Sequence, residues 1–125
     1  MGLLFGLLGD ASATDVAEVE EELVQILAEG ERVERAFQVI RDLLIFTPTR
    51  VILIDKQGIT AKKTEYHSIV YKAITHFSVE TAGHFDLESE LKIWISSNPE
   101  PITRTFKRGK SILEVQRALA TYVGR

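Results

Sequence analysis

The sequence of 125 residues contains no cysteine, no internal repeat and no glycine-rich phosphate-binding motif. Without cysteine, the chain forms no disulfide, thiolate metal site or cysteine nucleophile, which fits a reducing compartment. Every apolar run falls well short of the roughly 20 residues that cross a bilayer. With a net charge of −3 and an ordinary hydrophobic fraction, the composition is that of one globular domain with one core.

The N-terminus begins with a short apolar run, MGLLFGLLG. It carries no basic residue, is short for a signal peptide and is interrupted by Gly6. We therefore expect a cytoplasmic protein. Three interpretations of Leu3, Leu4 and Phe5 stay open: a tip that touches a membrane, a plug against a neighbouring surface, or a partly ordered tail.

Charge is unevenly distributed along the chain. Residues 1–40 hold nine acidic and two basic side chains, a net charge of −7, whereas residues 41–125 hold nine acidic and thirteen basic ones, a net charge of +4. This asymmetry fits docking of the acidic front on the basic body, within one chain or between chains. It also fits a solvated acidic helix face.

Hydrophobic periodicity predicts an amphipathic helix, about seven antiparallel strands and a closing helix. In residues 14–30, Val16, Val19 and Leu23 fall on one helical stripe, and glutamates occupy the opposite side. We expect two units: residues 1–30, with the apolar tip and this helix, and residues 31–125, a β domain with the closing helix. The predicted strands cover residues 33–40, 43–46, 51–54, 60–68, 74–81, 87–96 and 102–106, and the closing helix begins at Ser111.

Residues 41–63 organise the chain, because they hold two adjoining apolar runs at 43–46 and 51–54. Successive strand side chains point to opposite faces, so two continuous apolar runs imply a hairpin that is buried on both sides. One face packs on the domain core. The other face needs a cover, which is either the N-terminal helix or another copy of the protein.

Residues 74–81 and 87–96 form a second hairpin, in which apolar and polar residues alternate as in a sheet with one buried face. Trp94 falls on the polar face. A large aromatic residue there is either half covered by neighbouring side chains or an interface anchor, a position at which tryptophan is enriched.

Several patterns together resemble the bacterial pleckstrin-homology (PH) domain family, which was long catalogued as a domain of unknown function. Seven short strands followed by one helix match the order of a PH-like barrel, whose helix plugs one open end. Pro48 departs from the polar residue expected at its turn. The likeness covers nearly the whole chain and is carried by Arg41-Asp42, Phe46-Thr47-x-x-Arg50, Asp55-x-Gln57-Gly58, FSVETAGxFD at 77–86 and ELKIWI at 90–95.

The resemblance implies a mainly β fold with helices: a partly open barrel of about seven strands, capped by a C-terminal helix. It also implies a non-enzymatic scaffold or interaction module that assembles with itself into closed rings, as pentamers, with no established ligand. A ring requires a heterologous interface that closes. The hypothesised interface comprises the outward residues of the central hairpin, the tryptophan and the N-terminal apolar residues: Leu44, Phe46, Ile52, Ile54, Trp94, Leu3, Leu4 and Phe5.

Two basic clusters support an alternative function as a peripheral membrane or anionic-ligand module. Each basic residue contributes only ~1 kcal/mol to attraction by an anionic membrane surface. The loop between the first two predicted strands, residues 40–42, is too short and too nearly neutral to resemble the inositol-phosphate site of eukaryotic PH domains. The chain also lacks the overall basic charge of a nucleic-acid-binding protein. The clusters are Lys56, Lys62 and Lys63 around one turn, and Arg104, Lys107, Arg108 and Lys110 before the last helix.

No residue pattern indicates catalysis or metal binding. The three histidines, His67, His76 and His84, match no compact zinc motif. Strand alternation explains Glu88 and Glu90 without an acid–base pair. We expect no enzymatic activity, no metal and no cofactor.

Overall fold

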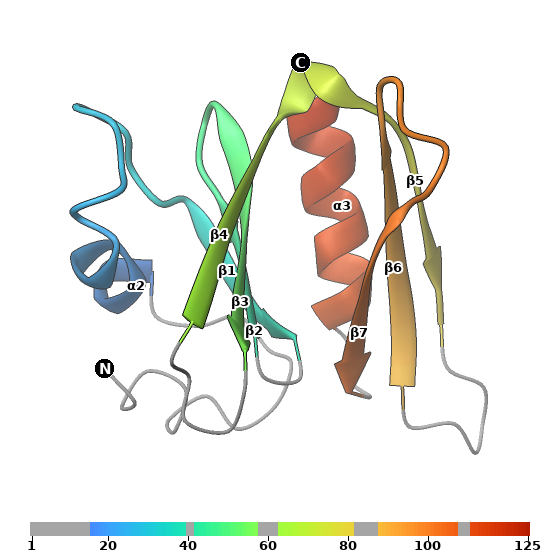
Figure 1. Ribbon diagram of the computed structural model, residues 1–125, viewed down its shortest axis with the longest axis horizontal. Coiled ribbons are helices and arrows are strands. Elements are labelled where there is room, and N and C mark those ends of the chain that lie inside the picture. The colour runs from blue at the N-terminus through green and yellow to red at the C-terminus, as the bar shows by residue number, and fades with distance from the viewer. Residues whose placement is uncertain (1–15, 40–41, 58–62, 82–87, 108–110) are drawn as a thin grey trace.

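The computed structural model describes residues 16–39, 42–57, 63–81, 88–107 and 111–125 (Figure 1). Within them, seven strands form two antiparallel sheets, one in the order β1-β2-β3-β4 and one in the order β5-β6-β7. The strands are β1 (Arg35–Val39), β2 (Asp42–Phe46), β3 (Arg50–Gln57), β4 (Lys63–Val70), β5 (Ile74–Glu80), β6 (Glu88–Ile95) and β7 (Ile102–Lys107). The helices are α2 (Val16–Glu22), the 3-10 turn η1 (Tyr71–Ala73) and α3 (Ser111–Val123).

The main core lies between the two sheets, where α3 fills the interior (Figure 1). Alternate residues of each strand point inward and meet the apolar stripe of α3, which recurs at helical spacing. The expected partly open barrel with a C-terminal helix is therefore confirmed. The largest fully buried members of this core are Phe37, Leu44, Phe46, Leu53, Leu91, Ile93, Phe106 and Leu119.

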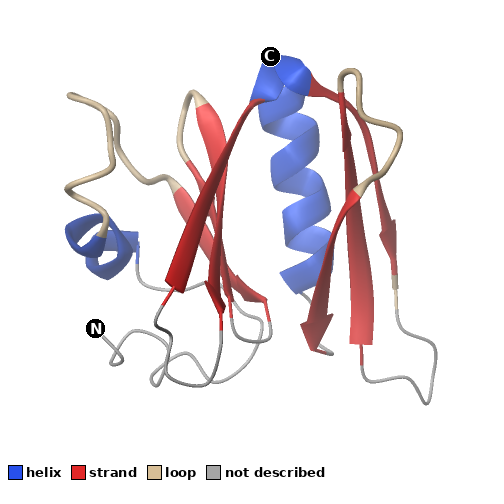
Figure 2. Cartoon of the chain, in the orientation of Figure 1, coloured by secondary structure: helices blue, strands red, loops and turns tan. Residues whose placement is uncertain are grey.

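A second core lies on the outer face of β1, β2 and β3, under the segment of residues 16–34, here called the strap. Figure 2 shows α2 and α3 on opposite sides of the four-stranded sheet. The strap buries Val19, Leu23 and Val33 against the sheet, and no strand residue of this core is more than 3% exposed. The strand residues are Ala36, Leu43, Ile45, Ile52 and Ile54. The chain itself thus covers the second face of the central hairpin.

Helix α2 is shorter than the sequence predicts, since it ends at Glu22 rather than near Gly30. Residues 23–30 form turns, in which side chains bind two of the backbone groups. Arg50 Nη2 donates to the carbonyl oxygen of Ile26 at 2.8 Å, and the Ala28 amide donates to the Glu31 carboxylate at 2.8 Å. Gly30, at φ +81°, adopts a conformation that favours glycine.

The strand predictions are confirmed to within a few residues for both hairpins and for the first and last strands. At one end of the barrel, here called the loop end, β1, β3, β5 and β7 finish and β2, β4, β6 and α3 begin (Figure 1). The opposite end, here called the closed end, holds the turn at residues 47–50, η1 and the C-terminus.

Candidate functional site

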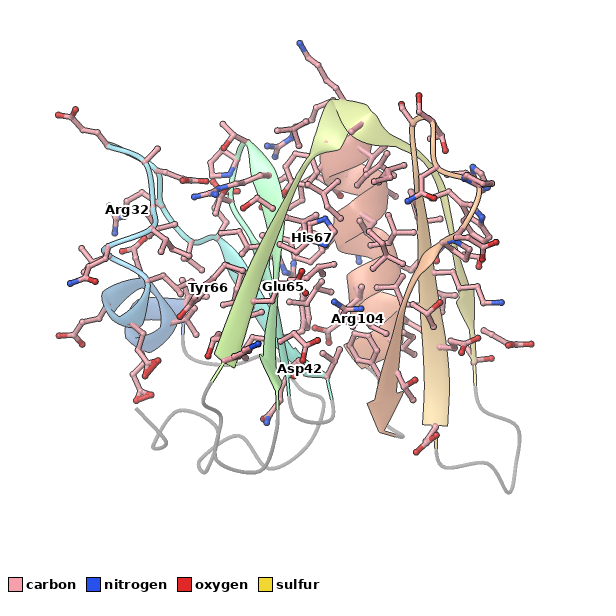
Figure 3. The ribbon with its side chains drawn as sticks, in the orientation of Figure 1. Arg32, Asp42, Glu65, Tyr66, His67 and Arg104 are labelled. Carbon is pink, nitrogen blue, oxygen red and sulfur yellow. The ribbon has the colours of Figure 1, made fainter. Side chains whose placement is uncertain are left out.

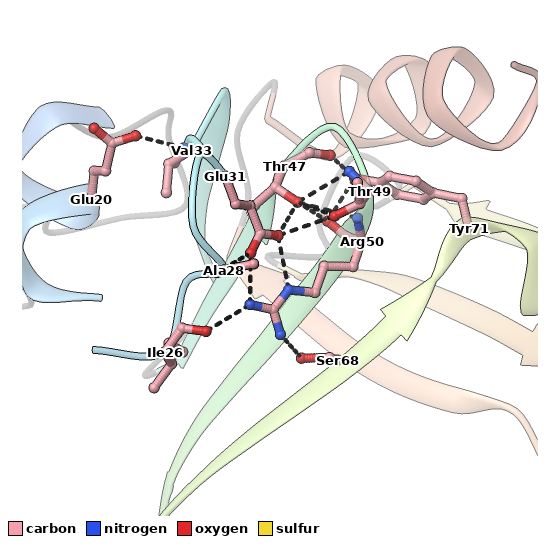
Figure 4. A network of polar contacts seen from close by, with 10 residues as sticks. All are labelled: Glu20, Ile26, Ala28, Glu31, Val33, Thr47, Thr49, Arg50, Ser68 and Tyr71. Atoms are coloured by element: carbon pink, nitrogen blue, oxygen red, sulfur yellow. Dashed lines mark hydrogen bonds and ion pairs between the residues drawn. The ribbon is translucent and has the colours of Figure 1, made fainter. Parts of the chain in front are cut away.

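The most developed polar network lies at the closed end, around an ion pair between Glu31 and Arg50 (Figure 4). Arg50 Nε and Nη2 each donate to one oxygen of the Glu31 carboxylate at 2.9 Å, a two-point contact that fixes both side chains. The hydroxyl of Thr47 donates to the same carboxylate at 2.7 Å, and Arg50 Nη1 donates to Ser68 Oγ at 2.7 Å. We call this arrangement the Glu31–Arg50 clamp.

The clamp is buried, because the side chain of Glu31 is only 4% exposed and that of Arg50 is 20% exposed. The hydrogen bonds from Arg50 hold the pKa of Glu31 at about 2, below its usual 4.5, although burial acts in the opposite direction. Arg50 also binds the backbone of the strap through Ile26. The clamp therefore joins the strap to β3, and every polar atom in it is already engaged by the chain.

An aromatic stack connects α3 to the same end of the barrel. The ring of Tyr122 stacks on Phe46 and Tyr71, with ring centroids 5.5 Å and 5.1 Å away. The Tyr71 hydroxyl contacts the carbonyl oxygens of Thr47 and Arg50 at 2.6 Å and 2.8 Å, and the Tyr122 hydroxyl donates to Glu34. Burial is the main cause that raises the pKa of Tyr122 to about 12, so this tyrosine stays protonated near neutral pH. The stack closes this end of the core.

Four of the hypothesised interface residues are buried within the single chain. Leu44 and Phe46 face the main core and are fully buried, whereas Ile52 and Ile54 face the strap and are at most 3% exposed. The hairpin register explains the split, because Leu44 pairs with Leu53 and Ile45 pairs with Ile52. The four residues thus do not form one outward face, which corrects the sequence prediction. Leu3, Leu4 and Phe5 lie outside the described residues.

Trp94 lies on the outer face of the three-stranded sheet, as the sequence predicts, and it is half-buried. Its ring stacks on the exposed His76 of β5, with ring centroids 4.3 Å apart and planes inclined by 14°. Thr75 Oγ1 lies 3.2 Å from the Trp94 carbonyl oxygen and 3.0 Å from His76 Nδ1, so its hydroxyl contacts both residues of the stacked pair. These contacts hold the two rings as a flat platform, here called the Trp94–His76 platform.

Three bases of the predicted clusters lie at strand ends that face the loop end (Figure 1): Lys56 near the end of β3, Lys63 at the start of β4 and Lys107 at the end of β7. The side chains of Lys56 and Lys107 are not described, and Lys62, Arg108 and Lys110 lie outside the described residues. Lys63 is exposed. Arg104 lies farther along β7, opposite the buried Leu91.

Acidic residues share the loop end with these bases. A cavity of about 360 Å³ there is lined by Glu80, Thr81, Glu88, Ser89, Glu90 and Thr105. On the other sheet, Asp55 and Glu65 are paired neighbours on β3 and β4. These carboxylates repel anions around the cavity. The described part of the loop end therefore carries charges of both signs rather than a basic surface.

The described residues hold no group of three histidine or carboxylate side chains placed to bind a metal ion. His67 lies on β4 and His76 on β5, in different sheets, and His84 lies outside the description. In the same part of the chain, no helix is both long and apolar enough to cross a bilayer.

The sequence did not identify Glu31 or Tyr71 as key residues. It noted Thr47 and Arg50 only within the pattern Phe46-Thr47-x-x-Arg50. In the structure this pattern fastens the strap and the core. Periodicity did not reveal the pairing, because Glu31 and Arg50 are 19 positions apart in the sequence. None of these groups is free to bind a substrate.

The sequence is similar to those of known bacterial proteins over nearly its whole length. The profile of a family described as "Bacterial PH domain" matches residues 2–123. The chain is 59% identical over 121 residues to "Uncharacterized protein YjqA" of Bacillus subtilis (strain 168), covering 96% of this chain and 97% of that protein.

Two crystal structures are also similar. A pleckstrin-homology domain from Shewanella amazonensis SB2B is 49% identical, with a TM-score of 0.81 and 98% of each chain covered. A DUF1696 family protein with a pleckstrin-homology domain, from Shewanella loihica PV-4, is 46% identical, with a TM-score of 0.79 and coverage of 92% of this chain and 98% of that one.

Proposed function

Because the chain belongs to the bacterial PH domain family, we propose that it is a non-catalytic interaction module that assembles with copies of itself into a closed ring, a pentamer. The Trp94–His76 platform is the observation that carries this proposal. Within the described residues, no helix or strand covers the outer face of β5 and β6 on which the platform lies. A rigid, half-buried tryptophan on an open face has the properties of an interface anchor.

The central hairpin no longer supports self-assembly, although its two apolar faces first suggested a neighbouring subunit. Both faces are buried within the chain, one against α3 and the other under the strap. A version of the protein without the strap would expose Ile45, Ile52 and Ile54 to water. Tests of assembly therefore use the full chain.

We expect light scattering to give a discrete multimer for the full chain, and we expect Trp94→Ala to weaken assembly by about tenfold or more, the effect of removing an anchor residue. Val24→Ala is the matched control, since Val24 is 69% exposed and lies outside the platform. Circular dichroism checks that both variants fold. A full chain that is monomeric at every concentration would refute the assembly.

A second candidate function, binding of anionic lipid surfaces, is favoured by Lys56, Lys63 and Lys107, which three strand ends bring to the loop end. The acidic cavity at the same end acts against it. Co-sedimentation with vesicles that contain anionic phosphatidylserine separates the two candidates. Binding at low salt that disappears at high salt would support the lipid function. We expect no co-sedimentation at low salt, a result that excludes it.

A further inference from the structure

The two sheets leave two unlike backbone edges open. The edge strands are β1 and β4 in one sheet and β5 and β7 in the other. β1 and β7 contact each other within the chain. In the described part of the chain, β4 pairs only with β3 and β5 pairs only with β6. The open edges therefore belong to β4 and β5, one from each sheet.

Strand β4 lacks the features that protect edge strands from pairing with another chain, which are shortness, proline, bulges and repeated lysines. It is eight residues long without proline, it pairs with β3 without a register shift, and its one lysine is its first residue. Tyr66 and Val70 on this strand are 48% and 55% exposed. Two of the large exposed apolar residues of the described chain thus lie on an open edge.

The side chains of β4 alternate between the two sides of the sheet. Figure 3 shows Tyr66 on the α2 side of β4, and Glu65 and His67 on the α3 side. The register agrees, because His67 pairs with the inward-facing Leu53. Both sides of the edge are therefore available for contact along most of the strand.

Strand β5 has a matching set of side chains. Phe77 and Val79 pack against the main core but remain half-exposed, because no strand lies beyond β5. His76 extends the Trp94–His76 platform to the open edge on the other side of the strand. The edge of β5 thus carries an aromatic residue on each side.

We propose that β4 of one copy pairs antiparallel with β5 of a second copy, an inference that rests on the self-assembly proposed above. Two unlike edges form a heterologous contact, which is the kind of interface that a ring requires. Each copy uses β4 toward one neighbour and β5 toward the other. Both open edges are then paired.

The sequences of the two strands select the antiparallel direction. With Lys63 opposite the partner subunit's Glu80, regular pairing extends as far as the partner subunit's His76, where a register shift in β5 ends the alternation. Tyr66 meets the partner subunit's Phe77, an aromatic cross-strand pair of the kind that stabilises sheets. A parallel arrangement that begins with Lys63 beside the partner subunit's Ile74 would instead set Ile69 beside the partner subunit's Glu80.

The same register extends the platform. His67 meets the partner subunit's His76, whose ring stacks on Trp94 of that subunit, so three flat rings follow one another across the contact. The side chains of paired residues lie on the same face of the combined sheet. The face of β4 that carries Tyr66, on the α2 side, therefore continues into the face of the partner's β5 that carries the partner subunit's Phe77, on the α3 side. The platform and the open edges thus belong to one interface.

The test replaces Tyr66 with lysine, which puts a charge at the centre of the edge. Leu113→Lys is the matched control, since Leu113 is 58% exposed on α3, away from both edges. We expect light scattering to show assembly weakened by about tenfold or more for Tyr66→Lys and unchanged for Leu113→Lys. A Tyr66→Lys chain that assembles like the wild type overturns the β4–β5 contact but leaves the ring in place. A monomeric wild-type chain overturns both.

Charge reversal tests the direction of pairing. Lys63→Glu and Glu80→Lys each place like charges opposite one another, and we expect each to weaken assembly by roughly threefold, the scale of an exposed ion pair. The double variant restores an opposite-charge pair at every contact, so it should assemble like the wild type. A double variant no better than the single variants would overturn the antiparallel register.

Discussion

Glu31→Gln is expected to lower the free energy of unfolding by about 3 kcal/mol at pH 7. The glutamine keeps the shape of the side chain but removes the charge that Arg50 contacts at two points. Arg50 would then lie 80% buried without an ionised partner. Urea unfolding at fixed protein concentration measures the change, since assembly makes stability depend on concentration.

The matched control is Glu29→Gln, which changes an exposed glutamate two residues away. A surface change of this kind stays within about 0.5 kcal/mol of the wild type. If Glu31→Gln cost as little as Glu29→Gln, the clamp would not be a stabilising feature of the fold.

The same clamp determines how stability responds to acid. The pKa of Glu31 is about 2 in the folded chain and 4.5 in its ordinary environment. Its contribution is therefore complete above pH 4.5 and is lost as the pH falls toward 2. The difference in stability between the wild type and Glu31→Gln should narrow over that range. A difference that stays constant down to pH 2 would contradict the assignment.

Phe46→Ala is expected to lower the free energy of unfolding by about 4 kcal/mol. The side chain is fully buried, meets Phe37 edge-on at 6.0 Å between ring centroids, and stacks on Tyr122 at 5.5 Å. Its removal leaves a cavity at the closed end of the core and breaks both ring contacts. Chemical denaturation measures the loss.

The same variant distinguishes a Phe46 buried in the core from a Phe46 exposed at a subunit interface. A side chain exposed for contact with another subunit would cost little in subunit stability when truncated. Leu113→Ala, at an exposed position on α3, is the comparison and should change stability by less than about 0.5 kcal/mol. A loss below about 1 kcal/mol for Phe46→Ala would contradict its place in the core.

The strands and the closing helix could be predicted because their signals are local. Alternation along residues 87–96 places Leu91 and Ile93 inside and Trp94 outside, and the structure agrees. The apolar runs of the central hairpin correctly indicate burial on both faces. Periodicity needs no knowledge of which elements meet in space, and it therefore locates these elements well.

The face of each hairpin residue could not be predicted in the same way. The sequence groups Leu44 and Phe46 with Ile52 and Ile54, but the register pairs Leu44 with Leu53. Register depends on turn geometry, and a shift of one residue exchanges the two faces. Counting along each strand separately therefore combined residues from opposite sides.

The end of α2 and the clamp depend on contacts between distant segments. The helical pattern continues to Gly30, yet the guanidinium of Arg50 on β3 donates to the carbonyl oxygen of Ile26, 24 positions away in the sequence. Tertiary contacts of this kind override local propensity. The sequence also left open what covers the second face of the central hairpin, because the N-terminal helix and a second copy of the protein both fit its apolar pattern. Only the three-dimensional arrangement shows that the strap covers it.

The most direct test of the self-assembly account is a native mass spectrum of the full-length chain over a range of concentrations. A closed ring gives one species, a pentamer, whose subunit number does not grow with concentration, since each β4 and each β5 is already paired. An open head-to-tail stack would give a ladder of masses instead. A spectrum that contains only the monomer would contradict the account.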